Sequence, residues 1–286
     1  MTIGVIGLGV MGSAMSKNII AGGHDVVGFD VDPLRAAEFV GEAVDSVATV
    51  VDRASVVLLS LPSVGALETV AREIADAAPT DTVVVEMGTL PLDAKQAAHD
   101  QLADVGVPLL DTPVSGTGLQ AADATLVVYS SGPENAHHQA EPIFSLIGKA
   151  THYLGEFGNG SRMKYVANLL VAVQTLAAAE AHALGAACGL DPQRVQEVIA
   201  AGVGTSAMFE IRGPMMAADN YEPPSARLDI ILKDAGIIAA HARSVGVTTP
   251  LLDCAIPMYQ QGSDAGYGDM DAASLRRFLD DLSEGQ

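Results

Sequence analysis

Basic residues and cysteine are scarce in this sequence of 286 residues, and tryptophan is absent. Lys and Arg number 15 against 35 Asp and Glu, so the net charge is −20 at pH 7. Nucleic acid and anionic membrane surfaces repel such a chain, and we expect neither as a partner. The two cysteines, Cys188 and Cys254, lack metal-type spacing, and no charged segment precedes the apolar start. A secreted, disulfide-built protein is therefore not expected, and a reducing cytoplasm fits best.

Uninterrupted apolar runs and metal-ligand patterns are also missing. The longest apolar stretch, residues 166–190, contains polar residues such as Asn168 and Glu180. We predict that it is too polar to cross a bilayer and forms a buried helix of a soluble protein. His137 and His138 adjoin each other, and on a helix their side chains would diverge. We therefore predict no metal site.

Apolar residues make up 49% of the chain, enough for a substantial core. In the first half, short β-branched runs alternate with helical stretches, which is typical of a doubly wound parallel sheet. The second half is helical only. We predict an α/β fold with a Rossmann-type NAD-binding domain at residues 1–157 and an all-helical substrate and oligomerisation domain at 158–286. The expected strands span residues 3–6, 26–29, 55–61, 82–87, 107–110, 125–131 and 152–154, and the expected helices span 160–189, 226–245 and 251–261, with another starting at Pro192.

The N-terminal run TIGVIGLGVMG places a G-x-G-x-x-G turn between a short apolar strand and a helix. In this pattern Gly7 makes a tight turn, Gly9 lets the backbone approach a pyrophosphate, and Gly12 packs the helix against the strand. The helix N-terminus supplies free N–H groups to the phosphates. We predict a dinucleotide site here, formed by Gly7, Leu8, Gly9, Val10, Met11 and Gly12.

Asp30 ends the next predicted strand, about 20 residues after the glycines, as the dinucleotide fingerprint requires. A carboxylate there accepts hydrogen bonds from both ribose hydroxyls and repels a 2′-phosphate. The nearby Arg35 is the kind of residue that binds a 2′-phosphate and argues the other way. We predict NAD as the cofactor over NADP.

Gly160, Lys164 and Asn168 have the spacing i, i+4, i+8, which stacks them on one face of the predicted long helix. Lys164 is a candidate to exchange a proton with a substrate hydroxyl or carbonyl, and Asn168 to orient that group. A surface lysine beside a core-facing asparagine would show the same spacing. The loops after Leu61, Met87 and Asp111 should face the cofactor, with the substrate between the two domains.

Four ordered motifs extend over nearly the whole chain: GLGVMG at Gly7–Gly12, DTPVSG at Asp111–Gly116, GSRMK with the later Asn168 at Gly160–Asn168, and LKDAG at Leu232–Gly236. On these motifs the chain resembles the β-hydroxyacid dehydrogenase family, which includes 3-hydroxyisobutyrate dehydrogenase and tartronate semialdehyde reductase. The resemblance implies that Lys164 is the catalytic acid/base and that Asn168 is its substrate-binding partner.

The same resemblance implies further site residues. It assigns Ser115 and Gly116 to the substrate carboxylate, whereas Thr117 departs from the glycine usual in the family and is counted with them as a substrate contact. Leu61, Pro62, Thr89 and Lys233 are implied cofactor contacts. An ordinary turn at residues 113–116, ordinary stop and cap signals at Pro62 and Thr89, and an exposed Lys–Asp pair at Lys233 would look the same locally.

Together these features predict an oxidoreductase that transfers a hydride between NAD and a small β-hydroxy acid, similar to 3-hydroxyisobutyrate, or its semialdehyde. The alternatives are an imine reductase or a phosphogluconate-type NAD(P) enzyme, and a sensor that binds NAD without catalysis. The apolar long helix favours a homodimer or homotetramer. Arg212 and Arg227 are conceivable partners of an anionic substrate, although no motif supports either.

Overall fold

The computed structural model describes residues 1–284 of the chain. It divides into two compact units, Met1–Lys164 and the residues from Tyr165 onward. The division falls inside the long helix α8 (Asn159–Ala187). The domain boundary expected before this helix, at residue 157, stays a prediction.

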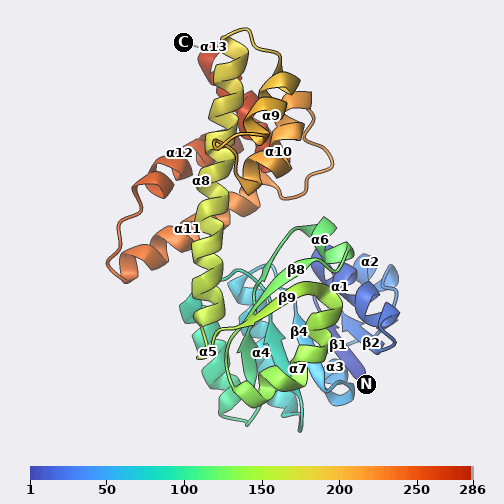
Figure 1. Ribbon diagram of the computed structural model, residues 1–286. Helices are drawn as coiled ribbons and strands as arrows, with labels where there is room; N and C mark the ends of the chain where they lie inside the picture. The colour runs from blue at the N-terminus through green and yellow to red at the C-terminus, as the bar shows by residue number, and fades with distance from the viewer. Residues whose placement is uncertain (285–286) are drawn as a thin grey trace. The chain divides into compact units, whose positions relative to one another are not determined.

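A six-stranded parallel sheet forms the centre of the N-terminal unit (Figure 1). Its order is β3-β2-β1-β4-β5-β6, so the direction of winding reverses between β1 and β4. Ligands of doubly wound sheets bind at the carboxyl ends of the strands beside such a reversal. The predicted fold class is confirmed. The strands are β1 (Thr2–Ile6), β2 (Asp25–Phe29), β3 (Glu42–Ala43), β4 (Val56–Leu59), β5 (Val83–Glu86) and β6 (Leu109–Asp111).

Helices cover both faces of this sheet. Along the buried strand β4, Val56 and Leu58 face one apolar core while Val57 and Leu59 face the other. A parallel strand covered on both sides reads as a continuous apolar run for this reason. The first core includes α1 (Val10–Ala21) and α7 (Glu134–Ile147), and the second includes α3 (Val47–Arg53), α4 (Val64–Ala77) and α5 (Leu92–Ala103); the short α2 (Pro33–Ala37) follows β2.

A second sheet corrects the strand prediction. The run at residues 125–131 and the strand after it do not join the parallel sheet but form a separate sheet of order β7-β8-β9. In it β7 and β8 are antiparallel, and β8 and β9 are parallel. A β-branched run predicts a strand but not its partner, because pairing depends on the turn between strands. The bounds are β7 (Val114–Ser115), β8 (Leu126–Ser130) and β9 (Gly148–Tyr153), with α6 (Gly118–Ala122) between β7 and β8.

The C-terminal unit is helical, as predicted. Asp191 accepts the Arg194 N–H at 2.9 Å and caps the helix that begins at Pro192. The helices at 207–218 and 275–284 were not predicted. After α8 the helices are α9 (Pro192–Ala200), α10 (Ala207–Ala218), α11 (Leu228–Ser244), α12 (Pro250–Gly262) and α13 (Leu275–Glu284), with short helical turns at Ser263–Tyr267 and Ala272–Ser274.

Helix α8 is long and apolar enough to cross a membrane when judged by length and composition alone. The sequence prediction that this stretch is too polar is therefore wrong on composition. A single helix of this kind is weak evidence for a membrane span. The predicted burial of this helix is also wrong within the chain, because only 33% of its most apolar 18-residue window is buried.

Candidate active site

Two of the three motif glycines are required by the packing of the chain itself. Gly7 has φ of +94°, and a Cβ on it would lie 2.3 Å from the carbonyl oxygen of Ser60. A Cβ on Gly12 would lie 2.0 Å from the carbonyl oxygen of Gly7. Any side chain at either position would force the strand, the loop and α1 apart. The roles predicted for these two residues agree with this geometry.

Gly9 differs, because the chain leaves room for a side chain there. Its added Cβ would meet no atom closer than the Arg35 guanidinium, 3.6 Å away. Gly9 is also the N-cap of α1 and contributes no side-chain hydrogen bond, while the next residue, Val10, is 76% exposed. The backbone N–H groups of the first helical turn are thus open to a ligand. The loop fits a dinucleotide pyrophosphate, which needs the space that a side chain at Gly9 would fill.

Asp30 follows β2 and binds the glycine loop directly. Its carboxylate accepts the N–H of Leu8 at 2.7 Å and that of Asp32 at 2.8 Å. Arg35 lies 3.7 Å from Asp30 and 3.5 Å from Asp32. A carboxylate has further lone pairs beyond the two it uses here, so Asp30 keeps capacity to accept ribose hydroxyls. Leu8 has a buried side chain and takes part through its backbone.

The loops after β4 and β5 lie at the same edge of the sheet as the glycine loop. The residue before Leu61 and Pro62 is Ser60, whose carbonyl faces Gly7. A Cβ on Gly88 would lie 3.3 Å from the carbonyl oxygen of Leu61, so the two loops touch, and Thr89 follows as a half-buried residue. Parallel strands that run side by side bring these loops together, as the strand pattern predicts.

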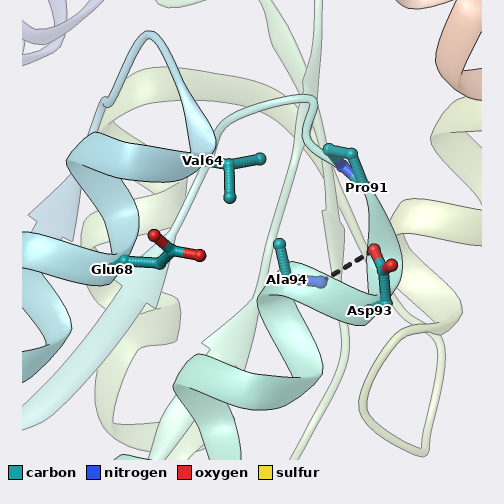
Figure 2. A pocket seen from close by; sticks show the side chains of 5 residues that line it. All are labelled: Val64, Glu68, Pro91, Asp93 and Ala94. Atoms are coloured by element: carbon teal, nitrogen blue, oxygen red, sulfur yellow. Dashed lines mark hydrogen bonds between the residues drawn. The ribbon is translucent and has the colours of Figure 1, made fainter.

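A pocket of about 350 Å³ opens between the first turns of α4 and α5 (Figure 2). Two of its side chains are acidic, Glu68 on α4 and Asp93 on α5. Val64, Pro91 and Ala94 complete its lining, and none of the predicted site residues lines it. The pocket is therefore separate from the predicted cofactor contacts, although the chain enters both helices from the loops just described.

The predicted substrate loop packs against the start of α1. Gly116 has φ of +137°, and a Cβ on Gly118 would lie 2.6 Å from the Val10 side chain. The loop of Ser115 and Gly116 is thus a neighbour of the dinucleotide loop. Thr117 directs its N–H and Oγ1 to Oε1 of Gln120, at 2.8 and 2.5 Å, and so caps α6. The polar groups of Thr117 serve the fold in this structure.

Lys164 lies one helical turn after the first residues of α8 and is 8% exposed. The turn before it is bound to the end of β6. The N–H and the hydroxyl of Ser161 both donate to the Asp111 carboxylate at 2.7 Å. Gly160 cannot be larger, because its Cβ would lie 2.5 Å from the carbonyl oxygens of Asp111 and Tyr129. Packing, and not only helical spacing, explains the glycine of this motif.

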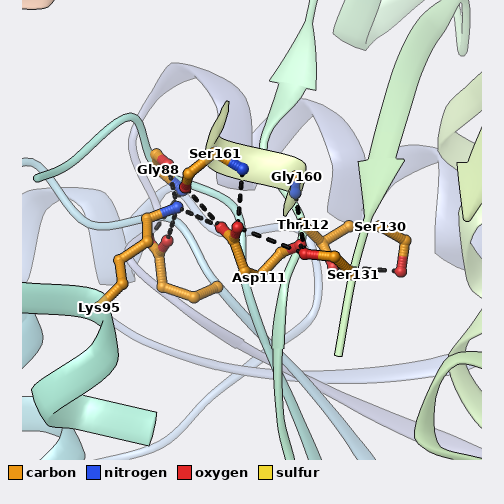
Figure 3. Close-up of polar contacts among 9 residues, drawn as sticks. Gly88, Lys95, Asp111, Thr112, Ser130, Ser131, Gly160 and Ser161 are labelled. Atoms are coloured by element: carbon orange, nitrogen blue, oxygen red, sulfur yellow. Dashed lines mark hydrogen bonds and ion pairs between the residues drawn. The ribbon is translucent and has the colours of Figure 1, made fainter. Parts of the chain in front are cut away.

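Asp111 belongs to a buried ionic cluster that the sequence analysis missed (Figure 3). The Lys95 cluster comprises Glu86, Lys95 and Asp111, all fully buried. Lys95 Nζ lies 2.5 Å from Glu86 Oε2 and 2.8 Å from Asp111 Oδ1. Burial acts to lower the pKa of Lys95, but the two carboxylates outweigh it and raise that pKa. Burial raises the pKa of Glu86, against the opposing effect of Lys95. The available signal was that an acid ends each of the apolar strands β5 and β6.

In the C-terminal unit, Asp234 contacts two of the predicted residues. Its carboxylate lies 3.1 Å from Lys233 Nζ and accepts the Asn168 side-chain amide at 2.8 Å. Asn168 follows Lys164 by one turn of the continuous helix α8. The structure therefore brings Lys233 and Asn168 to one carboxylate; the sequence predicts the contact of Asp234 with Lys233 but not the contact with Asn168.

The two arginines suggested for an anionic substrate both have protein partners. Arg212 is buried and lies 3.2 Å from the buried Asp271, so the suggestion for Arg212 is wrong. Arg227 pairs with Asp269 at 2.9 Å at the surface. A buried arginine needs a buried counter-charge, and the chain supplies one of its own.

The expected divergence of His137 and His138 is also wrong. These two residues and Glu141 each place a possible ligand atom within 4.8 Å of the others. Side chains of neighbouring helical residues point about 100° apart, but long side chains bend toward each other. His137 Nδ1 lies 2.9 Å from the Ser130 hydroxyl, and His138 lies 3.6 Å from Glu141.

Comparisons with known proteins identify the family of the chain. Residues 2–155 match the model of the NAD binding domain of 6-phosphogluconate dehydrogenase. Residues 158–279 match the model described as NAD-binding of NADP-dependent 3-hydroxyisobutyrate dehydrogenase. The two matches together cover both units and include all four sequence motifs.

Individual relatives match over nearly their full length. An L-threonate dehydrogenase of Cupriavidus necator is 35% identical over 280 residues, 96% of this chain and 94% of that protein. A 2-(hydroxymethyl)glutarate dehydrogenase of Eubacterium barkeri is 28% identical over 98% of this chain and 95% of its own. The crystal structure of a 3-hydroxyisobutyrate dehydrogenase from Salmonella typhimurium, 27% identical, superposes with a TM-score of 0.88 and covers 97% of this chain and 99% of that one. The chain belongs to the NAD-dependent β-hydroxyacid dehydrogenase family, enzymes that act on a CH–OH group.

Proposed function

We propose that this dehydrogenase interconverts a small β-hydroxy acid and the corresponding aldehyde or ketone acid, with Lys164 exchanging the hydroxyl proton. The observation that carries the proposal is the position of Lys164. It is a buried lysine one turn beyond Ser161, and Ser161 binds the end of β6 at the edge of the sheet that bears the cofactor loops. A lysine at such a place is suited to acid/base work.

The proposed substrate class rests on the names of the relatives. L-Threonate, 2-(hydroxymethyl)glutarate and 3-hydroxyisobutyrate each have a hydroxyl on the carbon β to a carboxylate. A site for this class needs one group to bind the carboxylate and another to take the hydroxyl proton. The Ser115 hydroxyl and the Gly116 N–H are proposed for the carboxylate, since both can donate hydrogen bonds.

In the direction of oxidation, neutral Lys164 accepts the hydroxyl proton at Nζ while the C–H bond of the same carbon breaks. NAD, when bound at the glycine loop, supplies the acceptor for the hydride. Asn168 donates from Nδ2 to Asp234, and its Oδ1, a hydrogen-bond acceptor, orients the reacting hydroxyl in this proposal. In reduction, protonated Lys164 returns the proton to the carbonyl oxygen.

Asp30, the glycine loop, Leu61, Pro62, Thr89 and Lys233 are the proposed cofactor contacts. Asp30 favours NAD because a carboxylate repels the 2′-phosphate of NADP. Thr117 is retained as a proposed substrate contact through its methyl group, since its N–H and hydroxyl already bind Gln120.

We also propose that the protein is a cytoplasmic homodimer or homotetramer that binds neither nucleic acid nor membrane. The support for an oligomer is an apolar, exposed face of α8 that includes Val166, Leu170 and Leu184. Exposed apolar side chains in a row mark an association surface. Light scattering on the purified protein distinguishes a dimer or tetramer from a monomer.

The test of the function is NADH formation with L-threonate, 3-hydroxyisobutyrate and 2-(hydroxymethyl)glutarate, for the wild type and Lys164→Met. We expect turnover with at least one of them. We expect Lys164→Met to lower kcat by about 10³-fold, the usual contribution of a general acid/base, with NADH binding unchanged.

The matched control is Lys149→Met, which removes an exposed lysine on β9 and should leave kcat at the wild-type value. Turnover by Lys164→Met near the wild-type rate would refute the role of the lysine. A wild type that is inactive on all three acids but active on an imine would refute the substrate class.

A further inference from the structure

The Lys95 ammonium contacts three residues, which lie on β5, in the loop after it, and at the end of β6. Nζ donates to the Gly88 carbonyl at 2.7 Å and to Asp111 Oδ1 at 2.8 Å, and it lies 2.5 Å from Glu86 Oε2. Two of the three ammonium donors are thus used in hydrogen bonds, and Glu86 adds a close ion pair. Lys95 is fully buried and lies on α5.

The first of these partners fixes the loop after β5. Gly88 is held from both sides, since its carbonyl accepts from Lys95 and its N–H donates to Glu86 Oε1 at 2.8 Å. A side chain at Gly88 would place its Cβ 2.7 Å from the same Glu86 oxygen. The next residue is Thr89, a proposed cofactor contact. Lys95 and Glu86 therefore set the backbone from which Thr89 projects.

The second partner fixes the start of α8. Asp111 Oδ1, which binds Lys95, also accepts the Ser161 hydroxyl, and Oδ2 accepts the Ser161 N–H. The neighbouring Gly160 N–H donates to the Ser131 hydroxyl at 2.9 Å, and that hydroxyl donates to the Asp111 carbonyl at 3.1 Å. The backbone N–H groups of Gly160 and Ser161 are thus both connected to Asp111, Ser161 directly and Gly160 through the Ser131 hydroxyl (Figure 3).

One buried cation consequently connects two segments that serve different reactants. We propose that Lys95 is a positioning residue that joins the cofactor loop at Gly88 to the first turn of α8, and so holds Lys164 at its working distance from the cofactor. The inference rests on the proposed role of Lys164. Lys95 itself touches no reactant in this scheme, and its effect passes through Gly88 and through Asp111 to Ser161.

A cluster that only stabilised the fold would lower the melting temperature without changing turnover by the folded enzyme. A positioning cluster has a different signature, because a displacement of about 1 Å far from the chemistry can reduce a rate by about 10²-fold. The two sets of contacts made by Lys95, one through Gly88 and one through Asp111 to Ser161, should also affect different kinetic constants. Loss of the Ser161 contact should lower kcat alone, whereas loss of the Gly88 contact should also raise KM for NAD.

The experiment compares Ser161→Ala, Ser161→Thr and Lys95→Met with Thr82→Val. Thr82 is the control because it too is buried, and its hydroxyl donates to the Ala54 carbonyl at 3.0 Å at the opposite, amino end of β5. All four proteins are checked for folding by circular dichroism, then assayed for kcat and for KM of NAD.

We expect Ser161→Ala to lower kcat about tenfold with KM for NAD unchanged, and Ser161→Thr to keep wild-type kcat because it retains the hydroxyl. Lys95→Met should lower kcat about 10²-fold and raise KM for NAD. Thr82→Val should melt earlier with wild-type kcat. If Lys95→Met does not fold, the comparison of kcat between Ser161→Ala and Thr82→Val still tests the positioning role.

Wild-type kcat in Ser161→Ala, or wild-type KM for NAD in a folded Lys95→Met, would overturn the inference. The proposed function fails separately, through turnover by Lys164→Met. An inactive Lys164→Met beside a fully active Ser161→Ala would leave the role of Lys164 standing and remove only the positioning role of Lys95.

Discussion

The two units each contain a buried carboxylate paired with a buried cation, but the two pairs hold different kinds of backbone. In the N-terminal unit Asp111 pairs with Lys95 and binds the N–H of Ser161. In the C-terminal unit Asp271 pairs with Arg212 at 3.2 Å and accepts N–H groups from Ser225, Ala226 and Ala273. The chemistry of the pairs is similar, so the difference lies in which segments they join.

The partners of Asp271 belong to turns between helices. Residues 225 and 226 lead into α11, and residue 273 is in the short turn before α13. Arg212 reaches further and donates to the Thr175 hydroxyl on α8 at 3.1 Å. This pair fastens helices and turns of one unit to each other, whereas the Lys95 cluster holds loops that we assign to cofactor and catalyst.

The N-terminal unit repeats one arrangement at the carboxyl edge of its parallel sheet. Asp30, Glu86 and Asp111 stand at the carboxyl ends of β2, β5 and β6, and each accepts a backbone N–H from an adjoining segment. Parallel strands bring such residues to one edge by geometry. A buried ion pair therefore does not by itself indicate a functional site. Its role depends on which backbone segments its carboxylate binds.

The largest effect should come from breaking the C-terminal pair. Burial acts to raise the pKa of Asp271, but Arg212 and the backbone donors outweigh it and lower that pKa, so the carboxylate is charged at neutral pH. Arg212→Met leaves this charge buried without its cation, which costs about 3–5 kcal/mol of unfolding free energy. Denaturant unfolding at pH 7 measures the loss, and we expect kcat of the folded fraction to be unchanged.

The pH dependence gives the same prediction a second readout. Because the pKa of Asp271 is depressed in the folded wild type, the stabilisation is present above the unfolded value of about 3.9 and is lost as pH falls below it. The difference in stability between wild type and Arg212→Met should shrink in that range. A folded Arg212→Met with reduced kcat would break the comparison, since it would give the C-terminal pair a catalytic role.

A smaller effect should follow from changing Asp30, the carboxylate after β2 that we propose binds the cofactor. Asp30→Asn keeps an oxygen for the Leu8 N–H but removes the charge, and Arg35, now paired only with Asp32, becomes available to a 2′-phosphate. We expect the ratio of kcat/KM for NADP to that for NAD to rise by about tenfold, or about 1.4 kcal/mol. Steady-state kinetics with both cofactors measures the ratio.

Asp32→Asn is the matched control for this prediction. Asp32 also lies near Arg35, but its main contact is the Leu34 N–H at the start of α2. The ratio of kcat/KM for NADP to that for NAD should change less in Asp32→Asn than in Asp30→Asn. An unchanged ratio in Asp30→Asn would mean that this strand-end acid, unlike the others, serves only to hold the glycine loop.

The smallest effect concerns two neighbouring histidines of the N-terminal unit. Burial lowers the pKa of His137, against the opposing effect of Glu141, while His138 is exposed. The unfolded chain therefore binds a proton that the folded chain resists, and stability falls as pH drops below about 6.5, by at most about 1.4 kcal/mol per pH unit for this one group.

His137→Asn, which keeps a hydrogen-bonding side chain near Ser130 but does not titrate, should flatten this pH dependence. His138→Asn should flatten it less, because the charge of the exposed His138 only adds to the effect of burial in lowering the pKa of His137. Thermal melts at pH 7, 6 and 5 compare the three proteins. An equal response of both variants would show that the burial of His137 does not control its titration.

Sequence patterns predicted much of the fold because they reflect local geometry. The glycine loop is the clearest case, since Gly12 is required by its contact with Gly7, and Gly7 has a backbone conformation of positive φ that favours glycine. The apolar strands and the long helix α8 followed from the length and composition of their apolar runs. The second sheet did not, because the run at 125–131 pairs with β7 and β9 through contacts that no local pattern encodes.

The Lys95 cluster shows why part of the site could not be predicted. A lysine inside a helix is ordinarily exposed, and only the approach of Glu86 and Asp111 from two strands makes a buried cation favourable. Arg212 was misjudged for the same reason, since its partner Asp271 is 59 residues away in the sequence. The role of Asp234 beside Asn168 likewise needed a contact across 66 residues.

By itself the sequence determined the class of the protein: a doubly wound nucleotide-binding half, a helical half, and four motifs of a β-hydroxyacid dehydrogenase. Glycine positions, strand periods and motif order are local properties, so the chain carries them without folding. Only the tertiary structure decided which charged side chains are buried and which backbone groups they hold. Ion pairs and hydrogen bonds between distant residues exist only once the sheet has brought its strand ends together, and the arrangement around Lys164 depends on such pairs.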